Sequence, residues 1–219
     1  MKKRFFTLGA ALMLAWSAWA EGMAKYVFYF IGDGMGVNQV NGTETYLAAL
    51  EGRIGVKPLQ FAQFPYTGLV TTYSATNGVT DSAAGGTALA TGQKTKNGVL
   101  GMLKDQKTRI SSIAERAKKS GRAVGVMTSV SVDHATPASF YAHVPDRNMY
   151  YEIGQDMLKA AFDFYGGSDF LQPTDKNNPQ APSLYVQSEQ AGYTIARGYD
   201  DYEKKKNDAG KMILLQTEE

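Results

Sequence analysis

The sequence contains no cysteine among its 219 residues. Disulfide bonds, thiolate metal sites and catalysis by a cysteine nucleophile are therefore all excluded. Any metal ion would have to be bound by carboxylates, imidazoles, hydroxyl groups or water. With 43% hydrophobic residues, the chain is still long enough to bury one core without covalent cross-links.

Histidine is almost as scarce, since His134 and His143 are the only two in the chain. A single histidine on a helix is more often a hydrogen-bonded structural residue than a metal ligand. We therefore expect no functional role for His143. The sequence also offers no cluster of histidines that could form a zinc site by itself.

Neither sign of charge is in excess. The chain has 23 Lys and Arg residues against 21 Asp and Glu residues. Residues 1–20 hold three of the bases and none of the acids, so the remainder has 20 bases against 21 acids. A nucleic-acid-binding protein would show a clustered basic surface, and we expect no nucleic-acid partner here.

Long hydrophobic runs are absent except at the N-terminus. Residues 2–4 are basic, residues 5–16 carry no charge, and residues 18–20 match the pattern of a signal peptidase site. These features predict a signal peptide over residues 1–20, cleaved after Ala20, and a secreted or periplasmic protein. A membrane anchor is the alternative, but the apolar run is short for a bilayer, and we expect no stable anchor after cleavage.

Short apolar runs alternate with helical patterns along the rest of the chain. Ser112 and Glu115 form a capping box, and Gly121 is suited to follow the end of the helix that this box begins. We expect strands over residues 26–31, 68–73, 122–128, 162–165 and 212–215. We expect further helices over residues 41–50, 82–92 and 200–209, helical structure over 137–161 with a break near Pro145, and a loop over 172–183.

This alternation predicts an α/β fold, a sandwich around a mostly parallel sheet. Ligands of such sheets bind beyond the carboxyl ends of the strands. Polar motifs follow the expected strands over 26–31 and 122–128, so we expect the functional site at that edge.

The first polar motif is Gly32-Asp33-Gly34-Met35-Gly36. A carboxylate stands where a buried strand would open into a loop, and the glycines allow the backbone to approach a ligand closely. Carboxylates bind Mg²⁺ and are accepted by Zn²⁺, so Asp33 is a candidate metal ligand. An ordinary tight turn with a capping aspartate is the alternative.

The second motif covers residues 80–88, with Asp81 and Ser82 followed by a run of small residues. Ser82 falls at or near the N-terminus of an expected helix, where free N–H groups favour an anion. The small residues would leave room for a substrate above the serine. The alternative is a simple serine N-cap, because a serine hydroxyl is a weak nucleophile unless a base or a metal activates it.

The third motif runs from Val132 to Arg147. The Thr136 hydroxyl could enter a Mg²⁺ coordination shell, although Thr136 is also placed as an N-cap before Pro137. The planar guanidinium of Arg147 could bind two phosphate oxygens, although a lone arginine is more often a surface ion-pair partner.

Taken together and in this order, the three motifs resemble those of alkaline phosphatases. The resemblance implies a three-layer α/β/α sandwich, a centre of two Zn²⁺ ions with an adjacent Mg²⁺, and hydrolysis of phosphate monoesters through a phosphoserine. It implies that Ser82 is the nucleophile and that Arg147, oriented by Asp81, binds the phosphoryl group. It further implies that Asp33 bridges a zinc and the magnesium, and that Thr136 is a magnesium ligand.

His134 stands where some bacterial members of that family have an aspartate near the magnesium, while the animal-type enzymes also have histidine. A neutral imidazole suits zinc better than magnesium. Two roles therefore remain open for His134, a direct metal ligand or a residue that supports one.

The resemblance also implies that residues 21–219 are the N-terminal portion of the catalytic domain, incomplete at the C-terminus. The family's other metal ligands come from its C-terminal half, so we expect little activity from this chain alone. The alternatives are a related metal-dependent phosphodiesterase or sulfatase, and a non-catalytic remnant that binds phosphate or metal. The assembly state stays open, with a homodimer as one alternative.

Overall fold

The computed structural model describes residues 24–216, and the chain forms two compact units that divide between Gln63 and Phe64. The expected signal peptide and its cleavage after Ala20 lie outside the described residues. Among the residues described, no helix is both long and apolar enough to cross a membrane.

The smaller unit is built on one long helix, α2, over Val37–Leu50, followed by a short 3-10 helix, η1, over Phe61–Gln63. Helix α2 confirms the helix expected over 41–50 and begins four residues earlier. The Gln39 side chain accepts a hydrogen bond from the Gly36 amide at 3.0 Å, which satisfies one free N–H group at the helix start. The Glu44 side chain accepts from the Leu59 amide at 2.8 Å and so holds the returning chain against the helix.

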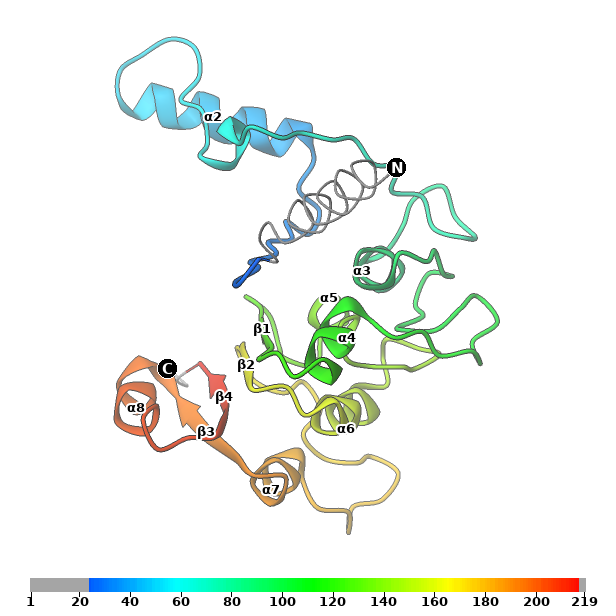
Figure 1. Cartoon of the computed structure of the whole chain (residues 1–219). Helices are drawn as coiled ribbons and strands as arrows, with labels where there is room; N and C mark the ends of the chain where they lie inside the picture. The colour runs from blue at the N-terminus through cyan, green and yellow to red at the C-terminus, as the bar shows by residue number, and fades with distance from the viewer. Residues whose placement is uncertain (1–23, 217–219) are drawn as a thin grey trace, which may run out of the picture. The chain divides into compact units, whose positions relative to one another are not determined.

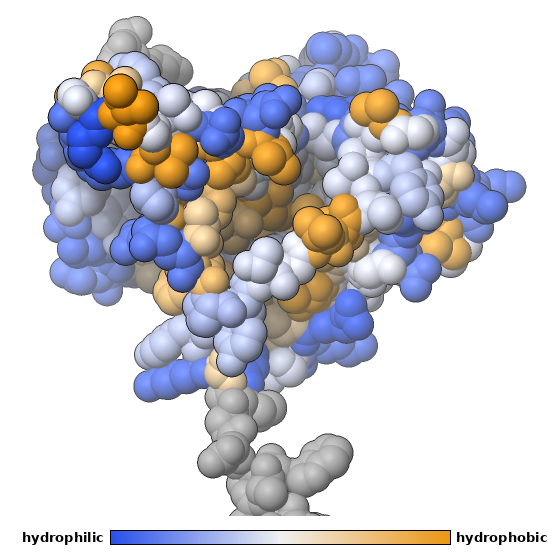
Figure 2. Space-filling view, turned by 90° about the horizontal axis from the view of Figure 1, so that it is seen from above, coloured by the Kyte–Doolittle hydropathy of each residue, from blue (hydrophilic) through white to orange (hydrophobic). Residues whose placement is uncertain are grey.

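Two of the expected strands are not strands. Residues 26–31 and 68–73 are irregular, and their apolar side chains are exposed, 88% for Phe30 and 103% for Leu69. A strand requires a hydrogen-bonded neighbour, and neither segment joins a ladder within residues 24–216. Exposed apolar side chains of this kind appear as orange areas between the polar ones in Figure 2.

The larger unit contains a four-stranded sheet in which every strand is parallel to its neighbours, in the order β1-β2-β4-β3 (Figure 1). The sequence-based prediction of a mostly parallel sheet is confirmed. The expected strands over 122–128, 162–165 and 212–215 are present with slightly different ends, and a fourth was not predicted. The strands are β1 Gly125–Met127, β2 Phe164–Gly167, β3 Tyr193–Arg197 and β4 Lys211–Leu215.

Helices cover both faces of this sheet, with α4 and α6 on one side and α8 on the other (Figure 1). This arrangement confirms the expected α/β/α layering. The helices of the larger unit are α3 Ser82–Thr91, α4 Ile113–Lys119, α5 Ala135–Ala138, α6 Tyr150–Ala160, α7 Leu184–Gln190 and α8 Gly198–Lys205.

The core lies between the sheet and α6. Tyr165 of β2 and Ile213 of β4 are paired in register, so their side chains point to the same face of the sheet. Both are fully buried in one cluster with Ile153 and Met157 of α6. Burying side chains of this size stabilises a fold by roughly 1.5–3 kcal/mol each. The Tyr165 hydroxyl also donates to the Met157 carbonyl at 2.8 Å, so the buried phenol is satisfied.

Candidate functional site

Ser82 is the first residue of α3, and Asp81 is its N-cap. The Asp81 Oδ1 atom accepts a hydrogen bond from the Ala84 amide at 2.9 Å, which explains why the helix begins here. The alternative reading of Ser82 as a simple N-cap is therefore wrong. Within residues 24–216 no hydrogen bond engages the Ser82 hydroxyl, so it is available to a ligand.

The small residues after Ser82 let α3 pack closely on α5. Ala83, Ala84 and Gly86 are buried. A Cβ atom on Gly86 would lie 2.5 Å from the Ser139 Oγ atom and 3.6 Å from the Thr136 carbonyl oxygen. The run of small residues therefore brings the serine helix against the helix that carries Thr136.

The second oxygen of Asp81 holds Arg147. Asp81 Oδ2 accepts from the Gly98 amide at 3.0 Å and from Arg147 Nη1 at 3.2 Å. The Arg147 amide in turn donates to the Gly98 carbonyl at 2.7 Å. Because the backbone and the side chain of Arg147 are both fixed, its guanidinium is oriented beside the N-terminus of α3.

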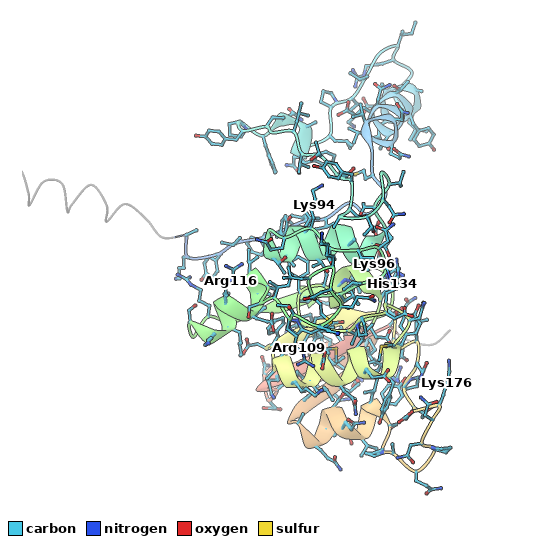
Figure 3. The ribbon with its side chains drawn as sticks, turned by 90° about the vertical axis from the view of Figure 1, so that its right-hand side faces the viewer. Lys94, Lys96, Arg109, Arg116, His134 and Lys176 are labelled. Atoms are coloured by element: carbon cyan, nitrogen blue, oxygen red, sulfur yellow. The ribbon has the colours of Figure 1, made fainter. Side chains whose placement is uncertain are left out.

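His134 lies on the other side of the arginine. Its Nε2 atom is 3.4 Å from Arg147 Nη2, and the residue is the N-cap of α5. Thr136 is consequently the second residue of α5 and Pro137 the third, so the expected placement of Thr136 as N-cap with Pro137 at the first helical position is wrong. Figure 3 shows His134 among the helices of the larger unit.

Asp33 belongs to the smaller unit. It lies with Gly34 in a turn closed by a hydrogen bond of 3.2 Å from the Met35 amide to the Gly32 carbonyl. The turn predicted as the alternative for this motif is therefore present, and Asp33 is exposed. Asp81, Ser82, His134, Thr136 and Arg147 all belong to the larger unit, and Asp33 belongs to the smaller one.

Asp133 is a buried carboxylate in the same region that sequence reasoning did not single out. It is 0% exposed and accepts hydrogen bonds from the Leu171 amide at 2.9 Å and the Gln172 amide at 3.3 Å. Burial raises the pKa of Asp133, against the effect of these hydrogen bonds. The carboxylate fastens the loop after β2 to the loop after β1, immediately before His134.

The described residues do not complete a zinc site. A structural or catalytic zinc takes at least three protein ligands. Within residues 24–216, no group of three or more His, Asp or Glu side chains could hold a metal ion together. His134 and Thr136 both lie at the start of α5, and Asp33 belongs to the smaller unit.

Comparisons with known proteins match a part of the chain that includes these residues. A sequence model described as alkaline phosphatase matches residues 24–172. Alkaline phosphatase 4 of Drosophila melanogaster is 38% identical over 133 residues, which are 57% of this chain and 22% of the fly protein. A membrane-bound alkaline phosphatase of Bombyx mori is 38% identical over 141 residues, 59% of this chain and 26% of the moth protein.

Solved structures agree over more of the chain. The alkaline phosphatase from the Antarctic bacterium TAB5 has a TM-score of 0.71 and 31% identity over 84% of this chain and 51% of its own. The Thermus thermophilus alkaline phosphatase has a TM-score of 0.70 and 31% identity over 86% of this chain and 39% of its own. Two variants of the TAB5 enzyme, with one histidine replaced by Glu or Asp, have Mg bound in the M3 site.

This chain therefore spans about half the length of the TAB5 enzyme and about a quarter of the insect proteins that it matches. Within that span the fold agrees with the two solved structures at TM-scores of 0.71 and 0.70. Because the sequence model covers more than half of its residues, the chain belongs to the alkaline phosphatase family.

Proposed function

We propose that this chain supplies the nucleophile and the phosphate-binding part of a metal-dependent phosphate monoesterase. In this proposal Ser82 attacks the phosphorus of a phosphate monoester and forms a phosphoserine, which water then hydrolyses. The observation that carries it is the placement of an oriented Arg147 guanidinium, through Asp81, at the helix end where Ser82 stands.

The residues of the larger unit suit an incoming phosphoryl group. The first N–H groups of α3 and the helix dipole favour an anion beside Ser82. The Arg147 guanidinium can donate two parallel hydrogen bonds to phosphate oxygens. Phosphoryl transfer depends mainly on positioning and charge neutralisation, and these two elements provide both.

Ser82 also needs activation, because a serine hydroxyl is a weak nucleophile at its ordinary pKa. We propose Zn²⁺ and Mg²⁺ as the cofactors, with Asp33, Thr136 and His134 among their ligands. A zinc ion held there would supply positive charge, which lowers the pKa of a nearby hydroxyl group. The described residues do not fit a complete zinc site, so the remaining ligands would come from a C-terminal half beyond the 219 residues. The Mg found in the TAB5 variants supports a metal-dependent family member.

We further propose that the chain is exported, with residues 1–20 removed as a signal peptide and the protein secreted or periplasmic. The charged, apolar and small-residue regions of the leader support this. N-terminal sequencing of the exported protein is expected to begin at Glu21. An uncleaved chain recovered from the cytosol would contradict export.

A second candidate is a non-catalytic remnant that binds phosphate. The absence of a three-ligand metal group from residues 24–216 favours it for the chain by itself. Both candidates predict phosphate binding, and only the first predicts a phosphoserine once the missing metal ligands are supplied. Turnover of diesters or sulfate esters would instead indicate a related phosphodiesterase or sulfatase.

The experiment is a calorimetric titration of the full chain with inorganic phosphate. We expect Arg147→Ala to weaken binding by about tenfold or more, because hydrogen bonds to charged groups contribute roughly 1.5–3 kcal/mol. Arg116→Ala is the matched control, since Arg116 is an exposed arginine of α4 (Figure 3). Equal phosphate affinity in Arg147→Ala and the unmodified chain would overturn the proposal.

A further inference from the structure

A second polar cluster surrounds His143, for which the sequence indicated no role. A cavity of about 300 Å³ lies beside it, with Arg109, Glu115, Tyr141, Asp156 and Lys159 among its lining residues. None of these residues takes part in the Ser82 region, and Figure 3 shows Arg109 apart from His134. The side chain of His143 is 13% exposed and that of Glu115 is 24% exposed.

Both ring nitrogens of His143 face pure hydrogen-bond acceptors. Nδ1 is 2.7 Å from the Gly101 carbonyl oxygen, and Nε2 is 2.8 Å from Glu115 Oε1. A carbonyl and a carboxylate have no hydrogen to donate, so both contacts are hydrogen bonds only when both nitrogens carry a proton. The geometry therefore selects the positively charged imidazolium.

The charges around the ring agree with this state. Burial lowers the pKa of His143, but the hydrogen bonds to Glu115 and Gly101 outweigh it, and the pKa is raised above its usual value. Asp156 of α6 adds a further negative charge, since its Oδ2 atom accepts from the His143 amide at 3.0 Å. The positive groups that line the cavity are Arg109 and Lys159, and Lys159 is paired with Asp156 Oδ1 at 2.9 Å. Tyr141 is neutral, because burial holds its pKa well above the usual value.

The contact with Gly101 lies beside an isolated antiparallel β-bridge, formed by two segments of which one leads to Arg147. Leu100 and Val144 exchange backbone hydrogen bonds of 3.0 and 3.1 Å. Further along the same pair of segments, the Arg147 amide donates to the Gly98 carbonyl at 2.7 Å. We define residues 98–101 and 143–147 as the Arg147 ribbon. His143 thus joins the two sides of the ribbon and ties them, through Glu115, to α4.

Gly101 shows how tightly this junction is packed. Its φ is +56°, a conformation that favours glycine. A Cβ atom there would lie 2.1 Å from the Ala142 carbonyl oxygen and 2.7 Å from His143 Nδ1. Any residue other than glycine would collide with the Ala142 carbonyl and with the imidazole. The close approach of His143 to the Gly101 carbonyl therefore requires a glycine at this position.

We propose that His143 is a positioning residue, whose imidazolium fastens the Arg147 ribbon to α4 and so couples the placement of the Arg147 guanidinium to the protonation of a remote histidine. The contacts of the His143 ring with Gly101 and Glu115 support this link between the ribbon and α4. Its consequence for phosphate rests on the proposed function. Loss of the proton removes one of the two hydrogen bonds, and the ribbon then opens more readily.

The test combines two measurements on the full chain without phosphate. NMR follows the ring protons of His143 against pH, and their signals are assigned by comparison with a His134→Gln variant, since His134 is the only other histidine in the sequence. Hydrogen exchange follows the amide protons of Val144 and Arg147, corrected for the intrinsic effect of pH. We expect His143 to titrate above 6.5, its usual value, and the protection of both amides to fall several-fold over that same pH range.

Glu115→Gln is the decisive variant, because it keeps an acceptor oxygen and the shape of the side chain but removes the charge. The titration of His143 and the loss of amide protection are both expected to move down together by about one pH unit or more. Glu189→Gln, at an exposed carboxylate of α7, is the matched control and is expected to move neither. Amide protection that does not follow the His143 titration, or a His143 that titrates at or below 6.5, overturns the proposal.

Phosphate titrations at two pH values, below and above the His143 transition, then test the consequence separately. Weaker binding at the higher pH in the unmodified chain, with the difference moved to lower pH in Glu115→Gln, supports the coupling. Intact coupling of exchange to His143 with no phosphate binding at any pH would leave the fastening in place and contradict the proposed function.

Discussion

The Asp81 carboxylate and the Arg147 guanidinium form an ion pair at 3.2 Å although 66 positions separate them in the sequence. The same carboxylate caps α3 through its other oxygen. One side chain thus fixes both the start of the serine helix and the direction of the arginine. Removal of the Asp81 side chain therefore affects both the stability of the helix and the position of Arg147. A substitution that keeps the cap but removes the charge separates the two effects.

Replacement of Asp81 by alanine is expected to lower the free energy of unfolding by about 0.5–2 kcal/mol, the usual cost of removing an N-cap. Asp81→Asn retains a good capping side chain and is expected to lose much less stability, but it removes the charge that faces Arg147. Urea unfolding measures the stability of both variants. Ser82→Ala is the neighbouring control and should change stability by less than about 0.5 kcal/mol, because the Ser82 hydroxyl has no hydrogen bond within residues 24–216. A larger loss in Ser82→Ala than in Asp81→Ala would show that the cap is misassigned.

Gly86 of α3 lies close to Ser139 at the end of α5. An added methyl group would lie 2.5 Å from the Ser139 Oγ atom, so Gly86→Ala is expected to destabilise the chain by about 1–3 kcal/mol. The double variant with Ser139→Ala removes the obstructing hydroxyl and should recover part of that loss. A double-mutant cycle by urea unfolding measures the recovery. Strictly additive losses would show that the two residues are not in contact.

Asp163 gives a prediction for the acid side of the stability curve. Its Oδ2 atom accepts from the Val124 amide at 2.8 Å, and Lys118 is 2.7 Å from Oδ1. Burial raises the pKa of Asp163, but the hydrogen bonds from Lys118 and Val124 outweigh it, and the pKa is lowered. The stabilisation is therefore present above the unfolded pKa of about 3.9 and is lost as the pH falls through the lower folded value.

Lys118→Met should remove part of this acid-side dependence, and its effect near neutral pH should stay below about 1 kcal/mol because the pair is partly exposed. Lys119→Met, at the exposed neighbouring lysine, is the matched control. Thermal unfolding between about pH 3 and pH 7 compares the stability of the two variants. Identical pH profiles for the two variants would show that Lys118 does not contribute to the loss of stability at acid pH.

Local signals predicted much of the larger unit. The Ser112 hydroxyl accepts from the Glu115 amide at 3.0 Å, and the Glu115 carboxylate accepts from the Ser112 amide at 2.7 Å, so the predicted capping box is confirmed. These contacts span three residues and follow directly from the residue types. The strand over 212–215 was equally clear, because four apolar residues in a row suit a strand buried by layers on both faces.

Long-range pairing could not be read in the same way. The apolar runs over 26–31 and 68–73 have the composition of strands, but composition does not supply a neighbour for the backbone to bond to. Conversely, Tyr193–Arg197 forms β3 beside β4 although its mixed polar and apolar residues gave no clear signal. Helix α7, over Leu184–Gln190, was missed because its only strong cue is a single capping serine, Ser183.

The candidate site likewise contains residues that belong to sequence motifs and residues that only long-range contacts place. The resemblance implied that Asp81 orients Arg147, and the two side chains are in contact at 3.2 Å, while the roles of Ser82 and Arg147 stay predictions. The burial of Asp133 and the two contacts of His143 depend on residues more than 25 positions away, at Leu171, Gly101 and Glu115. A single histidine in a sequence gives no sign of such partners, and so the expectation that His143 has no role left its position in the fold unexplained.

The most direct test of the central claim is the turnover of p-nitrophenyl phosphate by residues 21–219 at alkaline pH with added zinc and magnesium. We expect little or no turnover, because the described residues include Ser82 and Arg147, the proposed nucleophile and phosphate-binding residue, but no group of three ligands for a zinc ion. Turnover that a chelator stops and that Ser82→Ala abolishes would contradict this, and would mean that the chain assembles a metal site by itself.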